Sequence, residues 1–190
     1  MNTNILLCGV GGQGTVLASK LIASCAMEKG YSVMSAETIG MAQKGGSVFS
    51  FLRIGDQIYS PMFARHQADL LIAFEPAEAV RMIDYLKPDG TAIVASKPVM
   101  PVTSVLSKGN YSGSEMTDYI TKNISNSVIV DSEKACRDLG SARVLNMVLL
   151  GTAVKSGVLP FDLADAVSAM EKTVKPQFVE LNTKALNYNA

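Results

Sequence analysis

Apolar residues occur in short runs separated by glycine-rich or polar turns. Asn4–Gly9 is an apolar run that ends in glycines, and the apolar positions of Thr15–Lys29 then fall at helical spacing. Gly30 ends that segment, and Tyr31–Ala36 resumes an extended pattern. The first 36 residues therefore predict a strand, a helix and a second strand. Because such crossovers are right-handed and connect parallel strands, we expect the two strands to run parallel in one sheet.

The next segment predicts an antiparallel element. Ser47–Ile54 alternates and is rich in strand-forming residues. Gly55-Asp56-Gln57 is typical of a turn, and Ile58–Ser60 follows it as a hairpin partner that Pro61 ends. We therefore expect an antiparallel hairpin at one edge of the sheet.

The rest of the chain predicts further parallel strands and then helices. Apolar runs typical of buried strands are Asp69–Phe74, Thr91–Ser96 and Val128–Asp131. Helices are expected from Pro76 to about Lys87 and over Glu115–Ile124. Pro88-Asp89-Gly90 predicts a turn, and Lys97–Ser114 predicts a long mobile loop. From Ser132 onward the pattern is helical. The sequence thus predicts one α/β domain over residues 1–190: a three-layer, Rossmann-like, mostly parallel sheet with an antiparallel edge hairpin and a C-terminal helical cap.

Composition narrows the class of protein. Apolar residues make up 48% of the chain and charged residues 18%, which disfavours a disordered segment. Lys plus Arg equals Asp plus Glu at 17 each, so no net field attracts nucleic acid or an anionic membrane. No apolar run reaches the roughly 20 residues that a bilayer span needs. The N-terminus begins with a strand pattern rather than a signal peptide, and we expect a cytoplasmic protein.

The three cysteines, Cys8, Cys25 and Cys136, stand alone in the sequence. They form no C-x-x-C pair, and the single histidine, His66, is not at ligand spacing. We therefore expect no metal site in this chain, and any electron-transfer centre must be held by another chain. Cys8 ends a predicted buried strand, which favours an inert thiol over a nucleophile.

The strongest local motif is the glycine-rich turn Cys8–Gly14, which lies between a predicted strand and a predicted helix. It contains G-x-G-x-x-G at Gly9, Gly11 and Gly14, a pattern that brings backbone amides close to a phosphate. An acidic residue about 20 positions further on would hold a ribose, and Glu37 lies near that place. One interpretation is therefore a stand-alone domain that binds NAD or FAD.

A second glycine-containing stretch, Glu37–Gly46, changes this picture. It is more polar and glycine-rich than a plain connection, and Lys44 can meet a phosphate or carboxylate. A flexible surface loop is the alternative. We favour a functional loop that lies beside the first glycine turn, at the edge where open α/β sheets bind ligands. The candidate binding residues are Gly9, Gly11, Gly12, Gln13, Gly14, Glu37, Thr38, Gln43, Lys44, Gly45 and Gly46; no catalytic residue is predicted.

With both stretches considered, the chain resembles the gamma-type component of the 2-oxoacid:ferredoxin oxidoreductase family. The G-x-G-G-Q-G stretch at Gly9–Gly14 resembles the opening motif of that family, and Glu37–Gly46 is similar to the form found in its indolepyruvate branch. Ile58–Pro61, Ala68–Ala79 and Asn146–Gly151 also resemble the family, so the likeness covers nearly the whole chain.

The resemblance implies the smaller, cluster-free subunit of an enzyme complex. That complex would convert an arylpyruvate such as indolepyruvate, coenzyme A and oxidised ferredoxin into an aryl-acetyl-CoA, carbon dioxide and reduced ferredoxin. Thiamine diphosphate and iron–sulfur clusters would be held by a larger alpha subunit, and this chain would be inactive alone. The glycine loops would line the approach of coenzyme A. Other possibilities are a gamma subunit of a pyruvate or 2-oxoglutarate relative and a purely structural subunit.

Three further side chains could have either a structural or a functional role. His66 lies in a polar stretch before a buried strand, where a structural role is the simpler interpretation. Glu75 and Glu78 lie at the end of a strand and in the first turn of the next helix, which favours helix capping over a role in the site.

Overall fold

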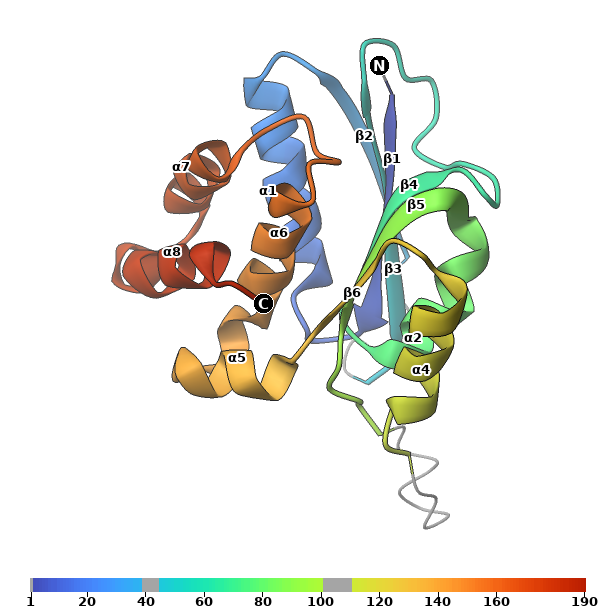
Figure 1. Cartoon of the computed structure of the whole chain (residues 1–190). Coiled ribbons are helices and arrows are strands. Elements are labelled where there is room, and N and C mark those ends of the chain that lie inside the picture. The colour runs from blue at the N-terminus through green and yellow to red at the C-terminus, as the bar shows by residue number, and fades with distance from the viewer. Residues whose placement is uncertain (1, 39–44, 101–110) are drawn as a thin grey trace.

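The computed structural model describes residues 2–38, 45–100 and 111–190 and contains a six-stranded mixed sheet (Figure 1). The strand order is β2-β3-β1-β4-β5-β6. The strands are β1 (Thr3–Val10), β2 (Ser32–Thr38), β3 (Ser47–Gly55), β4 (Ala68–Ala73), β5 (Leu86–Ala95) and β6 (Ser127–Val130). Strands β1, β4, β5 and β6 are mutually parallel, whereas β3 is antiparallel to both of its neighbours.

Helices cover both faces of this sheet. The described helices are α1 (Thr15–Glu28), α2 (Pro76–Met82), α4 (Ser114–Asn123), α5 (Ser132–Asp138), α6 (Leu145–Lys155), α7 (Leu163–Thr173) and α8 (Val179–Asn187). Figure 1 shows α2 and α4 on one face and α1 with the C-terminal helices on the other. Each face has its own apolar core, so the predicted three-layer α/β fold with a C-terminal helical cap is confirmed.

The order of the first strands differs from the prediction. Strands β1 and β2 point the same way, but β3 lies between them and pairs with both. Burial explains this placement. Phe51 and Leu52 of β3 are buried on opposite faces of the sheet, whereas no residue of β2 is buried and most are exposed, as suits an edge strand.

The antiparallel edge hairpin is present, but its strands are β2 and β3 rather than 47–54 and 58–60. Residues 56–60 form no strand. Instead, the Phe63 ring that follows packs edge-on against the Phe51 ring, with the ring centroids 4.8 Å apart. The Arg53 guanidinium also donates a hydrogen bond to the Ser60 carbonyl at 3.1 Å. The aromatic contact draws this segment away from the sheet edge.

The predicted turn at Pro88-Asp89-Gly90 lies inside β5. Helix α2 ends at Met82, a 3-10 turn covers Ile83–Tyr85, and the strand begins at Leu86. A Cβ on Gly90 would lie 2.7 Å from the Leu86 side chain and 2.9 Å from the Ala68 carbonyl oxygen. Glycine is therefore needed here for close packing, beside a register shift in the β4–β5 pairing, and not for a turn.

The later strands and the C-terminal helices agree with the prediction. The matched stretch Asn146–Gly151 has a packing role, because a Cβ on Gly151 would lie 2.0 Å from the Leu186 carbonyl oxygen of α8. Of the predicted mobile loop, residues 101–110 lie outside the described residues, as do residues 39–44 of the second glycine stretch.

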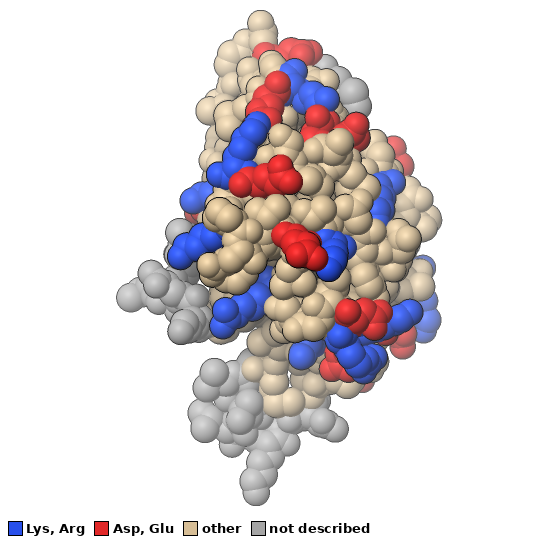
Figure 2. All heavy atoms as spheres, turned by 90° about the vertical axis from the view of Figure 1, so that its left-hand side faces the viewer, with Lys and Arg blue, Asp and Glu red and all other residues tan. Residues whose placement is uncertain are grey.

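Charges are interspersed over the face that the C-terminal helices form, with no large patch of one sign (Figure 2). Two ion pairs join the C-terminal end of α1 to α7: Lys172 Nζ lies 2.9 Å from Glu28, and Lys29 Nζ lies 2.9 Å from Asp165. Among the described residues, none of the helices combines the length and the apolar character that crossing a membrane requires.

Candidate glycine-loop site

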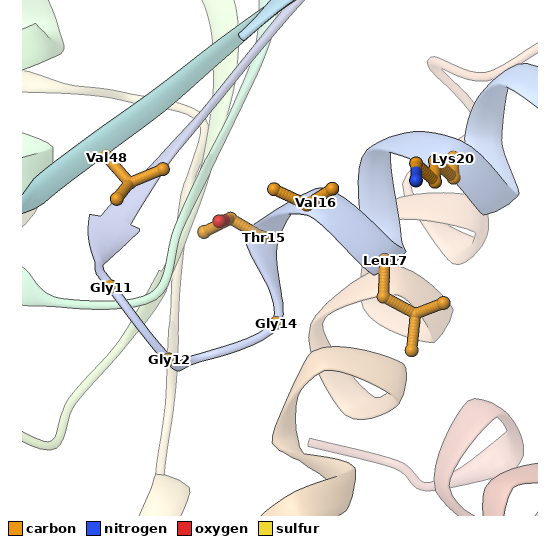
Figure 3. A pocket seen from close by; sticks show the side chains of 8 residues that line it. All are labelled: Gly11, Gly12, Gly14, Thr15, Val16, Leu17, Lys20 and Val48. Atoms are coloured by element: carbon orange, nitrogen blue, oxygen red, sulfur yellow. The ribbon is translucent and has the colours of Figure 1, made fainter. Parts of the chain in front are cut away.

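The first glycine motif forms the turn that connects β1 to α1 (Figure 3). Gly12 and Gly14 have φ angles of 102° and 88°, in the left-handed region that other residues rarely adopt. Gly14 is the N-cap of α1 and supplies no side-chain cap. The amides of the first helical turn therefore lack an internal partner and lie at the positive end of the helix dipole.

Hydrogen bonds of Gln13 and close packing at Gly9 hold this turn in place. The Gln13 Oε1 accepts a hydrogen bond from the Val10 amide at 2.7 Å, and its Nε2 donates to the Phe74 carbonyl at 2.9 Å. A Cβ on Gly9 would lie 2.8 Å from both Gln13 Oε1 and Phe74 Cβ. The Gln13 amide therefore connects the ends of β1 and β4, and both of its polar atoms are used within this chain.

The described end of the second glycine stretch, Gly45-Gly46, lies beside the first glycine turn, as predicted. Gly11 donates to the Gly46 carbonyl at 2.8 Å, and Gly45 donates to the Gly11 carbonyl at 3.3 Å. The two loops therefore form one glycine edge, composed of Gly9–Gly14 with Gly45 and Gly46, at the carboxyl end of β1. Gln43 and Lys44 lie outside the described residues.

Glu37 and Thr38 are not brought to this edge. Glu37 pairs with Ser50, which pairs with Leu7, so it lies level with a position three residues before the end of β1. Strand β3 also separates the two, which at the usual strand spacing places β2 about 10 Å from β1. A ribose held by the glycine turn would need the acid on an adjacent strand, so this geometry disfavours the dinucleotide interpretation.

A hollow of about 550 Å³ opens beside the glycine turn on the side of β3. Its lining comprises Gly11, Gly12, Gly14, Thr15, Val16, Leu17, Lys20 and Val48. Figure 3 shows Val48 on one side of this space and Thr15 and Val16 on the other, with Lys20 one turn further along α1. The hollow thus combines an apolar wall with the N-terminus of α1 and one cation, which suits a ligand with an anionic group and an apolar part.

Two buried carboxylates lie at the same edge. Glu75 acts as a cap, as predicted, whereas the Glu78 side chain contacts Ser47 and Arg81 instead. Glu75 is the N-cap of α2 and accepts from the Glu78 amide at 2.9 Å. Its other oxygen accepts from the Tyr111 hydroxyl at 2.6 Å, and burial and this carboxylate together raise the Tyr111 pKa above its usual range. Glu78 accepts from the Ser47 hydroxyl at 2.5 Å. Tyr111 was not identified from the sequence, because no local pattern connects it to Glu75.

Cys8 and His66 are the remaining residues that the sequence analysis considered one by one. Cys8 is fully buried, and burial followed by the charges of Glu78 and Glu75 raises its thiol pKa well above the ordinary value, so it is an inert thiol. His66 precedes β4 at the opposite end of the sheet and has a φ of 61°. In the described part of the chain, no group of three or more His, Cys, Asp or Glu side chains is arranged to hold a metal ion.

A sequence model of one protein family, described as pyruvate ferredoxin/flavodoxin oxidoreductase, matches residues 4–189. The chain belongs to this family. The match covers both glycine loops and all six strands except the first residue of β1. The resemblance recognised from the motifs is thereby confirmed.

The relatives agree with the branch that the second motif indicated. The chain is 35% identical over 187 residues to indolepyruvate oxidoreductase subunit IorB of Archaeoglobus fulgidus, covering 98% of this chain and 92% of the relative. It is 33% identical over 186 residues to the subunit of the same name from Pyrococcus horikoshii, covering 97% and 92%. The likeness to these two subunits therefore extends over nearly the full length of each chain.

A solved structure supports the fold. The gamma subunit of a keto/oxoacid ferredoxin oxidoreductase from Geobacter sulfurreducens matches with a TM-score of 0.73 and 26% sequence identity, over 98% of this chain and 93% of that one. The mixed sheet with an inserted antiparallel β3 is thus the architecture of a family gamma subunit.

Proposed function

We propose that this chain is the smaller subunit of a thiamine-dependent 2-oxoacid:ferredoxin oxidoreductase that decarboxylates indolepyruvate or related arylpyruvates. The observation that carries the proposal is the similarity to two indolepyruvate oxidoreductase subunits over nearly the full length of each chain, combined with a glycine turn at the N-terminus of α1. The products would be an aryl-acetyl-CoA, carbon dioxide and reduced ferredoxin.

In this proposal the complex has one shared active site. When bound in the larger alpha subunit, thiamine diphosphate supplies the carbanion chemistry of decarboxylation, and iron–sulfur clusters there pass electrons to ferredoxin. The present chain binds and orients coenzyme A. The backbone amides of Gly12 and Gly14 face an anionic group of coenzyme A. Its apolar arm packs against the side chains of Val16, Leu17 and Val48.

The buried carboxylates keep this edge rigid. Glu75 fixes the start of α2 and, through its hydrogen bond with Tyr111, the segment that leads into α4. The Ser47 hydroxyl connects the second glycine loop to Glu78. A preorganised edge of this kind lowers the entropic cost of holding coenzyme A for reaction.

The decisive experiment is purification of the native complex with its partner. The complex should reduce ferredoxin with indolepyruvate and coenzyme A, and the isolated chain should have no activity until the larger subunit is added. An isolated chain that is fully active would contradict the proposal. Preference of the complex for pyruvate or 2-oxoglutarate would move it to another branch of the family.

A second measurement tests the alternative. Tight binding of NAD or FAD by the isolated chain, abolished by Glu37→Ala, would favour a stand-alone dinucleotide domain. Replacing Gly12 and Gly46 by bulky residues tests a purely structural role, since unchanged activity of an intact complex would make the loops bystanders.

A further inference from the structure

The first turn of α2 lies between two segments that are distant from each other in the sequence. A small hollow of about 130 Å³ opens there, at the carboxyl end of β1 and β4. It is bordered by the end of the second glycine loop at Gly45 and Ser47, by the first turn of α2, and by Val99 and Tyr111. Val99 and Tyr111 belong to the connection between β5 and α4. Three parts of the chain therefore meet at this turn.

Glu75 is an uncommon residue for the N-cap of a helix. The preferred residues are Ser, Thr, Asp and Asn, whose short side chains accept from an amide of the first turn. Glu75 Oε2 performs this role by accepting from the Glu78 amide at 2.9 Å. Its longer side chain also carries Oε1 to the Tyr111 hydroxyl, at 2.6 Å, and to the Val99 amide, at 3.3 Å. The additional methylene group thus serves contacts outside the helix.

Tyr111 completes the arrangement. Its hydroxyl donates to Glu75 and accepts from the Ala77 amide at 3.1 Å, so a residue 34 positions further along the chain shares in capping α2. Glu75 is only 2% exposed. Because hydrogen bonds to a buried carboxylate do not compete with water, this side chain holds both Val99 and Tyr111 against the start of α2.

Glu78 makes the corresponding contact with the glycine loop. An acid at this third helical position often reaches back to the N-cap amide in a capping box. The Glu78 carboxylate instead accepts from the Ser47 hydroxyl at 2.5 Å and lies 3.1 Å from the Arg81 guanidinium. Ser47 follows Gly46, whose carbonyl accepts from the Gly11 amide. The contact therefore fixes the end of the second glycine loop beside the first.

We propose that Glu75 and Glu78 are positioning residues, and that the first turn of α2 aligns the second glycine loop with Val99 and Tyr111. The assignment rests on the proposed function, in which this edge of the sheet belongs to a shared active site. Neither carboxylate is a catalytic residue. Glu78 acts through Ser47, and Glu75 acts through Val99 and Tyr111.

Glu75→Asp separates capping from positioning. Aspartate is a good N-cap, so the Glu78 amide stays capped, but a side chain shorter by one methylene group does not reach Val99 and Tyr111. Amide hydrogen exchange of the full chain is followed residue by residue by NMR. Exchange should become about tenfold faster at Val99, which loses a hydrogen bond, and stay within about twofold at Glu78. Unchanged exchange at Val99 would overturn the proposal.

Kinetics of the purified complex test the consequence for the shared site. Glu75→Asp should raise the KM for coenzyme A about three- to tenfold and leave kcat within about twofold, because a misaligned edge weakens binding without touching the reacting atoms. Tyr111→Phe removes the same contact from its other side. The double variant should therefore resemble the single variants, whereas independent effects would multiply. Ser47→Ala should raise the same KM through the loss of its contact with Glu78.

Asp162→Ala is the matched control. Asp162 is the N-cap of α7 and accepts from the Asp165 amide at 3.0 Å, but α7 packs against other helices and does not border the hollow. The control loses a helix cap and should keep the wild-type KM. An equal rise in KM in this control, or a wild-type KM in Glu75→Asp, would overturn the proposal. A complex that reduces no ferredoxin would contradict the proposed function alone, and exchange at Val99 would still decide whether Glu75 holds this segment.

Discussion

Gly12 and Gly30 provide a matched pair of substitutions for testing the glycine edge. Both have left-handed backbones, with φ angles of 102° and 87°, and a Cβ added at either position would meet no atom within 4 Å. Gly12 lies in the turn at the carboxyl end of β1, whereas Gly30 ends α1 at the other end of the helix. Replacement by alanine thus introduces the same kind of backbone strain at two distant places.

The magnitude follows from the backbone alone. An L-residue in the left-handed region costs about 1–2 kcal/mol, and no steric term is added at either site. For a chain of this size, 1 kcal/mol lowers the melting temperature by roughly 2–4 °C. We therefore expect Gly12→Ala and Gly30→Ala to lower it by similar amounts, about 2–8 °C, in thermal unfolding followed by circular dichroism.

Activity should separate the two variants. If the turn presents its amides to coenzyme A, Gly12→Ala in the purified complex should raise the KM for coenzyme A severalfold at a temperature where both variants are folded. Gly30→Ala should leave it unchanged. The same KM in both variants, with assembly intact, would refute the assignment of the glycine edge to coenzyme A.

Three further results are expected. Tyr111→Phe removes a hydrogen bond to the buried Glu75 carboxylate and should cost about 1–2 kcal/mol in the free energy of unfolding, measured by urea denaturation; an unchanged midpoint would contradict this. The pKa of Asp165 is lowered, first by a backbone hydrogen bond and then by Lys29, so its contribution is present above the unfolded pKa and is lost as pH falls through the folded pKa. Asp165→Asn should thus destabilise the chain at pH 7 but not at pH 2, and an equal loss at both would refute it. In native labelling with iodoacetamide, Cys136 should react first and the two buried cysteines only after unfolding; equal rates would contradict the structure.

The strands and helices that the sequence predicts well are those whose burial dictates their pattern. Strand β4, buried along nearly its whole length, and the helices after Ser132 appear where the apolar spacing placed them. The position of β3 could not be predicted in this way, because alternation in Ser47–Ile54 indicates a strand but not its neighbours. Pairing depends on the burial of Phe51 and Leu52 from both faces, a property of the assembled sheet.

The site, too, has features that the sequence predicts and features that only the folded chain shows. Adjacency of the two glycine loops follows from topology, since one ends β1 and the other precedes β3, which pairs with it antiparallel. The contact between Glu75 and Tyr111 spans 36 positions and has no local signature. A motif reports short-range geometry, and long-range hydrogen bonds are fixed only by the fold.

The glycine motif and the charges around it have different origins. Within the motif, the Gln13 side chain accepts from the Val10 amide and donates to the Phe74 carbonyl, so it holds the turn in place. Three cations close to the glycine turn, Lys20, Lys97 and Arg143, come from separate elements and belong to no motif. Among the 17 basic residues, the sequence singled out Lys44 and none of these three. The motif therefore predicts the turn, whereas the basic side chains around it are brought beside it only by the fold.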